Sequence, residues 1–128
     1  MNAAAPLLDV SAVSAGYSGE LVVHDVTFAV APGEAVAIIG SNGAGKSTLF
    51  RAIVSIVRKG AGTVRLDGTD VGRLATHRIS RLGLAYVPAE RHLFPQMSVA
   101  ENLRLGAYPG RPCPGVERTV YELFPRLH

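Results

Sequence analysis

Residues 40–47 read Gly-Ser-Asn-Gly-Ala-Gly-Lys-Ser and match the phosphate-loop pattern G-x-x-x-x-G-K-[ST] at every fixed position. Glycine residues allow tight backbone turns that bring several amide N–H groups together around one anion. Lys46 contributes an ammonium group, and Ser47 contributes a hydroxyl group suited to Mg²⁺. The stretch therefore predicts a site for the phosphates of a nucleoside triphosphate. Its candidate binding residues are Gly40, Ser41, Asn42, Gly43, Ala44, Gly45, Lys46, Ser47 and Thr48.

The sequence on either side of this stretch fits the same prediction. Residues 35–39 form a short apolar run that is typical of a buried strand. Residues 46–57 predict a helix, because apolar residues recur on one face at helical spacing. These residues are Leu49, Ile53, Ile56 and Val57. A glycine turn that matches the pattern by chance is the alternative, and the order of strand, loop and helix disfavours it.

The composition fits one compact domain and argues against membrane insertion. The chain has 128 residues, of which 48% are hydrophobic, so it can bury a core. No apolar run approaches the roughly 20 residues that a membrane-spanning helix needs. The N-terminus has no basic segment before its first apolar residues, which disfavours a secretory signal. We therefore expect a cytoplasmic protein.

Charge and reactive side chains point to no second site. All 13 Lys and Arg residues lie after residue 45, and the net charge is +3. A nucleic-acid surface is one explanation, but the arginines are dispersed without interleaved aromatics, which favours solvated faces. Cys113 is the only cysteine, and we expect no reactive role for it. No zinc site is expected either, because His24, His77, His92 and His128 are scattered along the chain.

The other elements are predicted from apolar periodicity and turn residues. Strands are expected over residues 7–13, 21–30, 63–66 and 84–87, with a turn at 16–19. Helices are expected over residues 73–82, 98–105 and 116–124. Ser98 and Glu101 form a capping box at the start of the second of these helices. Residues 59–62 are expected to break the pattern, and residues 109–115 to form a flexible connection.

Three segments together resemble a known family. They are GSNGAGKSTL at 40–49, YVPAERHLFPQMSVAENL at 86–103 and VYELFPRLH at 120–128. The chain resembles an ATP-binding cassette of the transporter superfamily, and it looks most like the ATPase subunit of branched-chain amino acid importers. The resemblance covers residues 1–128. It implies an α/β fold of the phosphate-loop NTPase class: an antiparallel β subdomain, the phosphate-loop strand and helix, and the start of a helical subdomain.

The resemblance also implies roles for individual residues. Tyr17 lies where the family places an aromatic ring that stacks on adenine, although a turn tyrosine packed on the first strand pair is the alternative. The amides of Gly43, Ala44 and Gly45, together with Lys46, would hold the β- and γ-phosphates of ATP. Ser47 would hold Mg²⁺. Thr48 would approach the α-phosphate.

The loop after residue 87 departs from the family pattern. Ala89 stands where cassettes commonly have a glutamine that senses Mg²⁺ and the γ-phosphate. Either that role is lost or Glu90 takes it over, and a surface carboxylate paired with Arg91 is an equal alternative for Glu90. The resemblance places residues 92–98 near the docking site for a membrane subunit. There the apolar side chains of Leu93, Phe94 and Met97 would make contact or instead form a local core.

The sequence lacks the later elements of a cassette. It has no L-S-G-G-Q-like signature and no apolar run ending in Asp-Glu, and no switch histidine follows. We therefore expect an incomplete domain that binds ATP without turnover. The predicted strand at 35–39 would have an edge without a neighbouring strand, so we expect the isolated chain to be marginally stable.

The resemblance implies the function of an ATP-binding subunit that couples ATP hydrolysis to the import of branched-chain amino acids. Its partners would be a second ATP-binding subunit and transmembrane permease subunits, on the cytoplasmic face of the membrane. A truncated cassette that binds ATP without hydrolysis is one alternative. A non-transport cassette acting on nucleic acid is another, which residues 120–128 disfavour.

Overall fold

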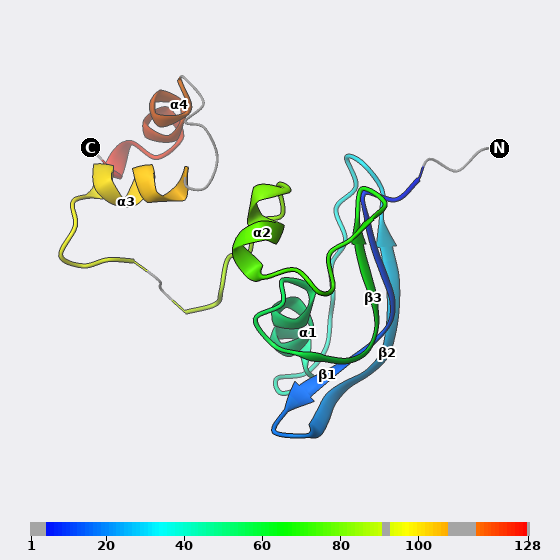
Figure 1. Cartoon of the computed structure of the whole chain (residues 1–128). Coiled ribbons are helices and arrows are strands. Elements are labelled where there is room, and N and C mark those ends of the chain that lie inside the picture. Colours follow the sequence, from blue (N-terminus) through cyan, green and yellow to red (C-terminus); the bar gives the residue numbers. More distant parts are fainter. Residues whose placement is uncertain (1–4, 91–92, 108–114, 128) are drawn as a thin grey trace. The chain divides into compact units, whose positions relative to one another are not determined.

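The computed structural model describes residues 5–90, 93–107 and 115–127. The chain divides into two compact units, Met1–Tyr86 and Val87–His128. The first unit holds a sheet and two helices, and the second holds helices only (Figure 1). The predicted α/β class is therefore visible within the first unit.

The sheet of the first unit has four antiparallel strands in the order β2-β1-β3-β4. The strands are β1 (Leu8–Tyr17), β2 (Glu20–Val30), β3 (Lys59–Leu66) and β4 (Thr69–Asp70). β1 and β2 form a hairpin in which Tyr17 pairs with Glu20, and the predicted turn is confirmed at Ser18 and Gly19. β1 is hydrogen-bonded on both sides, by β2 and by β3.

β1 is longer than the predicted strand because a bulge interrupts its alternation. Val10, Val13 and Ala15 are fully buried, and the first two are three residues apart rather than two. Ala12 lies between them with φ 53°, and its N–H donates to Thr27 Oγ1 at 2.9 Å. A bulge of this kind adds one residue to a strand and restores the inward direction afterwards.

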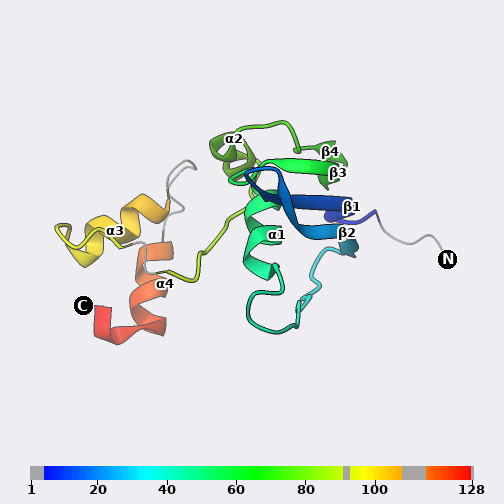
Figure 2. The same ribbon diagram turned by 90° about the horizontal axis from the view of Figure 1, so that it is seen from below.

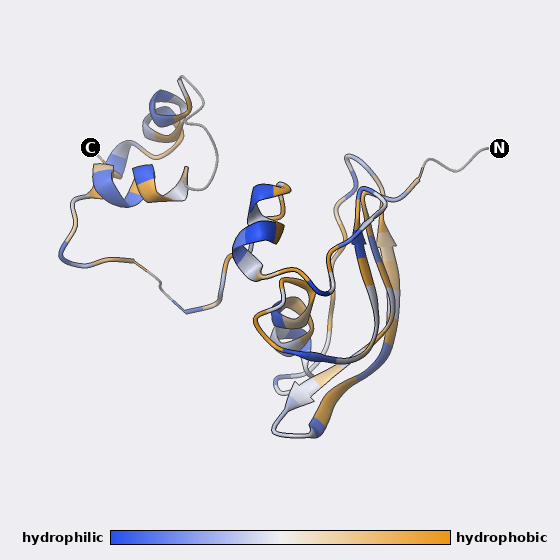
Figure 3. Cartoon of the chain, viewed as in Figure 1, coloured by the Kyte–Doolittle hydropathy of each residue, from blue (hydrophilic) through white to orange (hydrophobic). Residues whose placement is uncertain are grey.

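Helix α1 (Lys46–Ile53) lies against one face of this sheet (Figures 1 and 2). Helix α2 (Thr76–Arg81) contributes Ile79 to the same core. Hydrophobic and hydrophilic residues alternate along the strands, as a sheet with one covered face requires (Figure 3). The buried core consists of Val10, Val13, Val23, Leu49, Ile53, Val64, Leu66, Val71 and Ile79.

Three further elements of this unit differ in their bounds from the prediction. α1 ends at Ile53 rather than at residue 57, because Ser55 adopts a left-handed φ of 59°, and Ile56 is 53% exposed while Val57 remains buried. β3 begins at Lys59, so the glycine-rich residues 59–62 form a strand, which is paired with β1. α2 covers only the middle of the predicted helix at 73–82.

Two predicted buried strands are absent from the described residues. Residues 35–39 have no strand structure, and Ile39 is 93% exposed. Residues 84–87 likewise form no strand, and Val87 is 89% exposed. All described strands belong to the antiparallel sheet, so neither segment has a neighbouring strand to satisfy its backbone groups.

The second unit contains α3 (Val99–Gly106), α4 (Val116–Leu123) and the short 3₁₀ helix η1 (Pro125–Leu127). The predicted capping box is confirmed: Ser98 N donates to Glu101 Oε2 at 2.8 Å, and Glu101 N donates to Ser98 Oγ at 3.3 Å. Most of the predicted connection at 109–115, Cys113 included, lies outside the described residues.

Candidate functional site

The phosphate loop approaches β2 closely at Gly45, where an added side chain would be crowded. Gly45 caps the start of α1 with a φ of 90°, a conformation that side chains disfavour. A Cβ atom at Gly45 would lie 3.0 Å from Val23 Cγ2 and 3.2 Å from the carbonyl oxygen of Val22. The glycine therefore lets the loop turn and lets the start of α1 approach the sheet closely.

The start of α1 is open to an anion. The first N–H groups of a helix have no intrahelical acceptor, and Gly45 has no side chain to cap them. The helix dipole adds partial positive charge at the same end. These groups face a hollow of about 240 Å³, which is lined by Val22, Asn42, Gly43, Gly45, Lys46, Ser47 and Thr48. The structure thus brings six of the nine predicted loop residues to one hollow.

The ammonium group of Lys46 folds back over the loop. Its Nζ donates to the carbonyl oxygens of Gly40 and Ser41, each at 2.7 Å. A lysine has three N–H donors, so these two bonds hold the ammonium in place and leave one donor for a phosphate oxygen. Gly40 and Ser41 therefore serve the site by orienting the lysine, and they do not line the hollow.

Ser47 and Thr48 differ in accessibility. Ser47 is exposed at the hollow, whereas Thr48 is only 8% exposed. Among the described residues, no cluster of three or more His, Cys, Asp or Glu side chains could hold a metal ion. Mg²⁺ commonly keeps several waters and uses phosphate oxygens with few protein ligands, so a single hydroxyl fits it only together with the nucleotide.

Tyr17 ends β1 and reaches toward α1. The residue is 45% exposed, and its hydroxyl accepts a hydrogen bond from Arg51 Nη1 at 3.4 Å. Hydrogen bonds from Arg51 and then Thr48 lower the pKa of the Tyr17 phenol below its usual value. The tyrosine thus contacts the phosphate-loop helix as well as its own hairpin. Arg51 is not among the residues predicted from the sequence, because no local pattern links it to Tyr17; it lies three residues after Thr48, on the same side of α1.

The candidate residues of the second unit remain predictions. Glu90 belongs to this unit, and its alternative partner Arg91 lies outside the described residues, as does His92. Leu93 and Phe94 are 69% and 56% exposed, so they are not packed into a local core of the described residues. Asn102 instead organises this loop, because its side chain donates to the carbonyl oxygens of Phe94, Met97 and Ser98.

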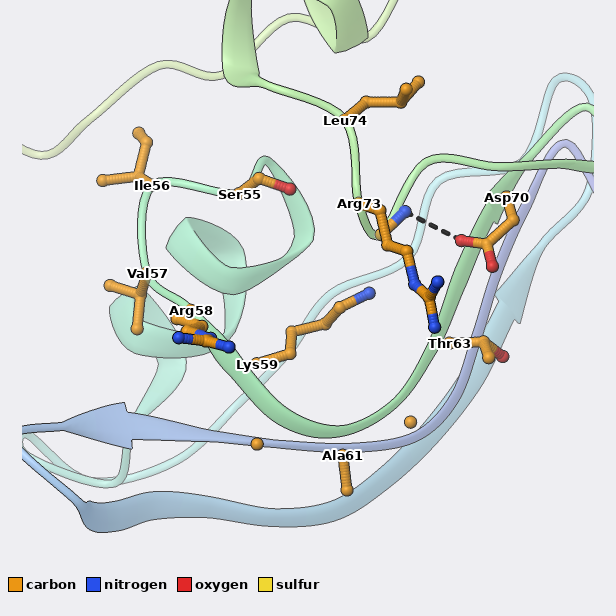
Figure 4. A pocket seen from close by; sticks show the side chains of 13 residues that line it. Ser55, Ile56, Val57, Arg58, Lys59, Ala61, Thr63, Asp70, Arg73 and Leu74 are labelled. Atoms are coloured by element: carbon orange, nitrogen blue, oxygen red, sulfur yellow. Dashed lines mark hydrogen bonds between the residues drawn. The ribbon is translucent and has the colours of Figure 1, made fainter.

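A second and larger hollow, of about 570 Å³, contains no phosphate-loop residue (Figure 4). Arg58, Lys59, Arg73 and Asp70 line it, and Asp70 Oδ1 accepts the Gly72 N–H at 2.8 Å. Burial lowers the pKa of Lys59, and the charge of Asp70 opposes that shift. The negative charge of Asp70 offsets the positive charge of Lys59 in this hollow, and the two arginines are exposed to solvent. These groups would therefore attract a polyphosphate only weakly, and we assign the nucleotide site to the phosphate loop.

Comparisons with known proteins support a nucleotide site at the phosphate loop. A model of the ABC transporter family matches residues 23–128. The lipopolysaccharide export system ATP-binding protein LptB of Acidithiobacillus ferridurans is 40% identical over 124 residues, which cover 95% of this chain and 51% of that protein. A putative ribose/galactose/methyl galactoside import ATP-binding protein of Pseudomonas syringae pv. syringae is 42% identical over 106 residues, which cover 82% of this chain and 20% of that protein. A solved structure of an ABC transporter ATP-binding subunit matches with a TM-score of 0.74 at 35% identity. The match covers 85% of this chain and 45% of that chain.

These similarities confirm the family and the predicted cassette fold class. The chain spans about half the length, or less, of the relatives it matches. The relatives are named for lipopolysaccharide export and sugar import, so they do not confirm the finer resemblance to branched-chain amino acid importers. None of the described helices is long and apolar enough to cross a membrane. The chain belongs to the ABC transporter family, and the part of the ATP-binding cassette that it matches includes the phosphate loop.

Proposed function

We propose that this chain binds Mg²⁺-ATP through residues 40–48 and forms part of the ATP-binding subunit of a transport system. One observation carries the proposal: the glycine-capped start of α1 lines one hollow together with Lys46, whose ammonium is held by the carbonyl oxygens of the loop. This arrangement supplies N–H donors, partial positive charge and a full positive charge to a polyphosphate. Ser47 would complete the site by binding the Mg²⁺ that bridges the phosphates.

The base is proposed to lie on Tyr17. Its 45% exposed ring offers a face for stacking, and its link to α1 keeps it near the helix that holds the phosphates. Replacing Tyr17 with alanine is expected to weaken ATP binding by about 1 to 3 kcal/mol, the usual value of one base-stacking contact. Binding of inorganic tripolyphosphate should be unchanged.

Turnover is proposed to need groups beyond those of this chain. Phosphoryl transfer to water requires an acidic residue that holds the metal and a group that orients the water. Among the described residues, only Glu90 is a candidate for such a role, and nothing beyond its position in the sequence supports it. We infer that a second ATP-binding subunit and permease subunits, at the cytoplasmic face of the membrane, form the working assembly.

The solute is proposed to be a branched-chain amino acid, on the resemblance of residues 86–103 and 120–128. The names of the relatives provide the competing solutes, a lipopolysaccharide and sugars. Uptake of labelled leucine and of labelled ribose by cells with and without the gene separates these solutes. Loss of leucine uptake alone supports the proposal, and loss of ribose uptake alone contradicts it.

Equilibrium binding of Mg²⁺-ATP to Lys46→Ala tests the site. The variant removes the ammonium of the hollow, and we expect binding to fall below detection. Lys59→Ala is a matched control, because Lys59 is the only other lysine of the sequence and lines the other hollow. Normal ATP binding by Lys46→Ala, or equal losses in both variants, would refute the assignment.

A further inference from the structure

One side-chain contact joins the end of the β1–β2 hairpin to the phosphate-loop helix. Arg51 Nη1 donates to the Tyr17 hydroxyl oxygen at 3.4 Å, across 34 positions of sequence. Arg51 lies in α1, one turn beyond Ser47. The same helix therefore presents N–H groups to the phosphates at its start and a guanidinium to the tyrosine one turn later.

Small residues hold the backbones of β1 and α1 close together on both sides of this contact. Ala15 and Ala52 are fully buried and pack together with Val57, so β1 and α1 touch next to Tyr17 and Arg51. Gly16 lies between Ala15 and Tyr17, and a Cβ atom there would overlap the carbonyl group of Glu20. The hairpin can thus close tightly at Tyr17, which pairs with Glu20.

The Tyr17 ring itself is less constrained than its backbone. It is 45% exposed, and burial alone does not select one orientation of an exposed ring. The contacts with α1 supply that selection: the Arg51 guanidinium and, three residues earlier, the Thr48 side chain both face the phenol oxygen. Both contacts are made with the hydroxyl oxygen, and the residue as a whole is 45% exposed.

We propose that Arg51 is a positioning residue that orients Tyr17 for the nucleobase. The inference rests on the proposed stacking role of Tyr17. A ring held in one orientation before binding loses less conformational freedom when the base arrives, so the base binds more tightly. Removing the guanidinium leaves every phosphate contact in place and frees the ring.

Binding of ATP and of inorganic tripolyphosphate, each with Mg²⁺, tests this inference on Tyr17→Ala and on four further variants. Arg51→Ala is expected to weaken ATP binding by about 2- to 10-fold, which corresponds to one ordinary hydrogen bond. Tyr17→Phe keeps the ring and removes the hydroxyl, so it should show at least the same loss, because the Thr48 contact is removed as well. The double variant should show no loss beyond that of Tyr17→Phe, because the Arg51 contact is already broken in that variant. Tripolyphosphate binding should be unchanged in all three, and Arg58→Ala is the matched arginine control.

The outcomes distinguish failure of the positioning role of Arg51 from failure of the proposed stacking role of Tyr17. If Tyr17→Ala weakens ATP binding while Arg51→Ala and Tyr17→Phe do not, stacking stands and the positioning role fails. If Tyr17→Ala has no effect, the stacking proposal itself fails. If Arg51→Ala weakens ATP and tripolyphosphate equally, Arg51 acts on the phosphate site or on folding, and the inference is refuted. Additive losses in the double variant also contradict it.

Discussion

The buried positions of β1 and the segment 35–39 both consist of alanine and β-branched apolar residues, and the structure uses them in opposite ways. β1 is paired with β2 and β3, and its Val10, Val13 and Ala15 are fully buried. Segment 35–39 has no strand partner among the described residues, and only Ile38 packs against the core while Ile39 is 93% exposed. An apolar run is therefore buried only where neighbouring strands and a covering layer are present.

The largest expected effect compares two isoleucines. Ile79 is fully buried and Ile39 is 93% exposed, so the same substitution probes both environments. Ile79→Ala should lower the free energy of unfolding by about 2 to 5 kcal/mol, because it leaves a cavity in the core. Ile39→Ala should change it by less than about 0.5 kcal/mol. Urea denaturation measures both, and equal losses would show that segment 35–39 is packed in solution.

The next effect compares two glycines of the phosphate loop. Gly43 and Gly45 both have positive φ, at 84° and 90°, but only a Cβ at Gly45 would meet neighbours within 4 Å. Gly45→Ala should destabilise the chain more than Gly43→Ala, whose cost is the backbone strain of about 1 to 3 kcal/mol alone. Thermal unfolding of the two variants measures the difference. A larger loss for Gly43→Ala would mean that the loop does not approach β2 as described.

The elements that the sequence predicts well are those whose signals are local. The turn at Ser18 and Gly19 and the capping box of Ser98 and Glu101 each depend on a few adjacent residues, and both are confirmed. Residues 59–62 are read wrongly because their strand depends on pairing with β1, 45 or so positions earlier, as for Ala61 with Ser14. The strand predictions for residues 35–39 and 84–87 are wrong for the converse reason, because no described strand pairs with these segments.

The candidate site divides in the same way. The pattern at 40–47 identified the loop because its glycine, lysine and serine positions are set by local backbone geometry. Arg51 was not found, because its partner Tyr17 is 34 positions away and no sequence pattern links the two. Tertiary packing of Ala15 on Ala52 creates that proximity.

The second unit offers a smaller test, at the start of α3. Ser98→Ala should destabilise α3 by about 1 kcal/mol, seen as faster amide exchange in residues 99–102. The hydrogen bonds from the Ser98 backbone and side chain lower the pKa of Glu101. The stabilisation from this carboxylate is therefore present above its usual pKa and is lost as the pH falls through the lowered value. Protection of these amides, relative to the intrinsic exchange rate at each pH, that does not fall as the pH is lowered through this acidic range would contradict the capping role.

The smallest effect concerns the ionisation of Tyr17. Its phenol should ionise at a lower pH than an ordinary tyrosine, because the hydrogen bond from Arg51 favours the phenolate. Arg51→Ala should therefore raise the pKa of Tyr17. Ultraviolet titration of the tyrosinate band, compared with a Tyr17→Phe variant to identify the signal, measures this change. An unchanged titration would mean that the contact is not formed in solution.

Amide NMR spectra of the chain during titration with Mg²⁺-ATP test the central claim most directly. The claim is that the phosphates bind at the glycine-capped start of α1 and not in the larger hollow. We predict large shifts for the amides of Gly43, Gly45, Lys46 and Ser47, with little change at Gly60, Gly62 and Gly72. Shifts confined to the latter glycines, or no shifts at saturating nucleotide, would contradict the account.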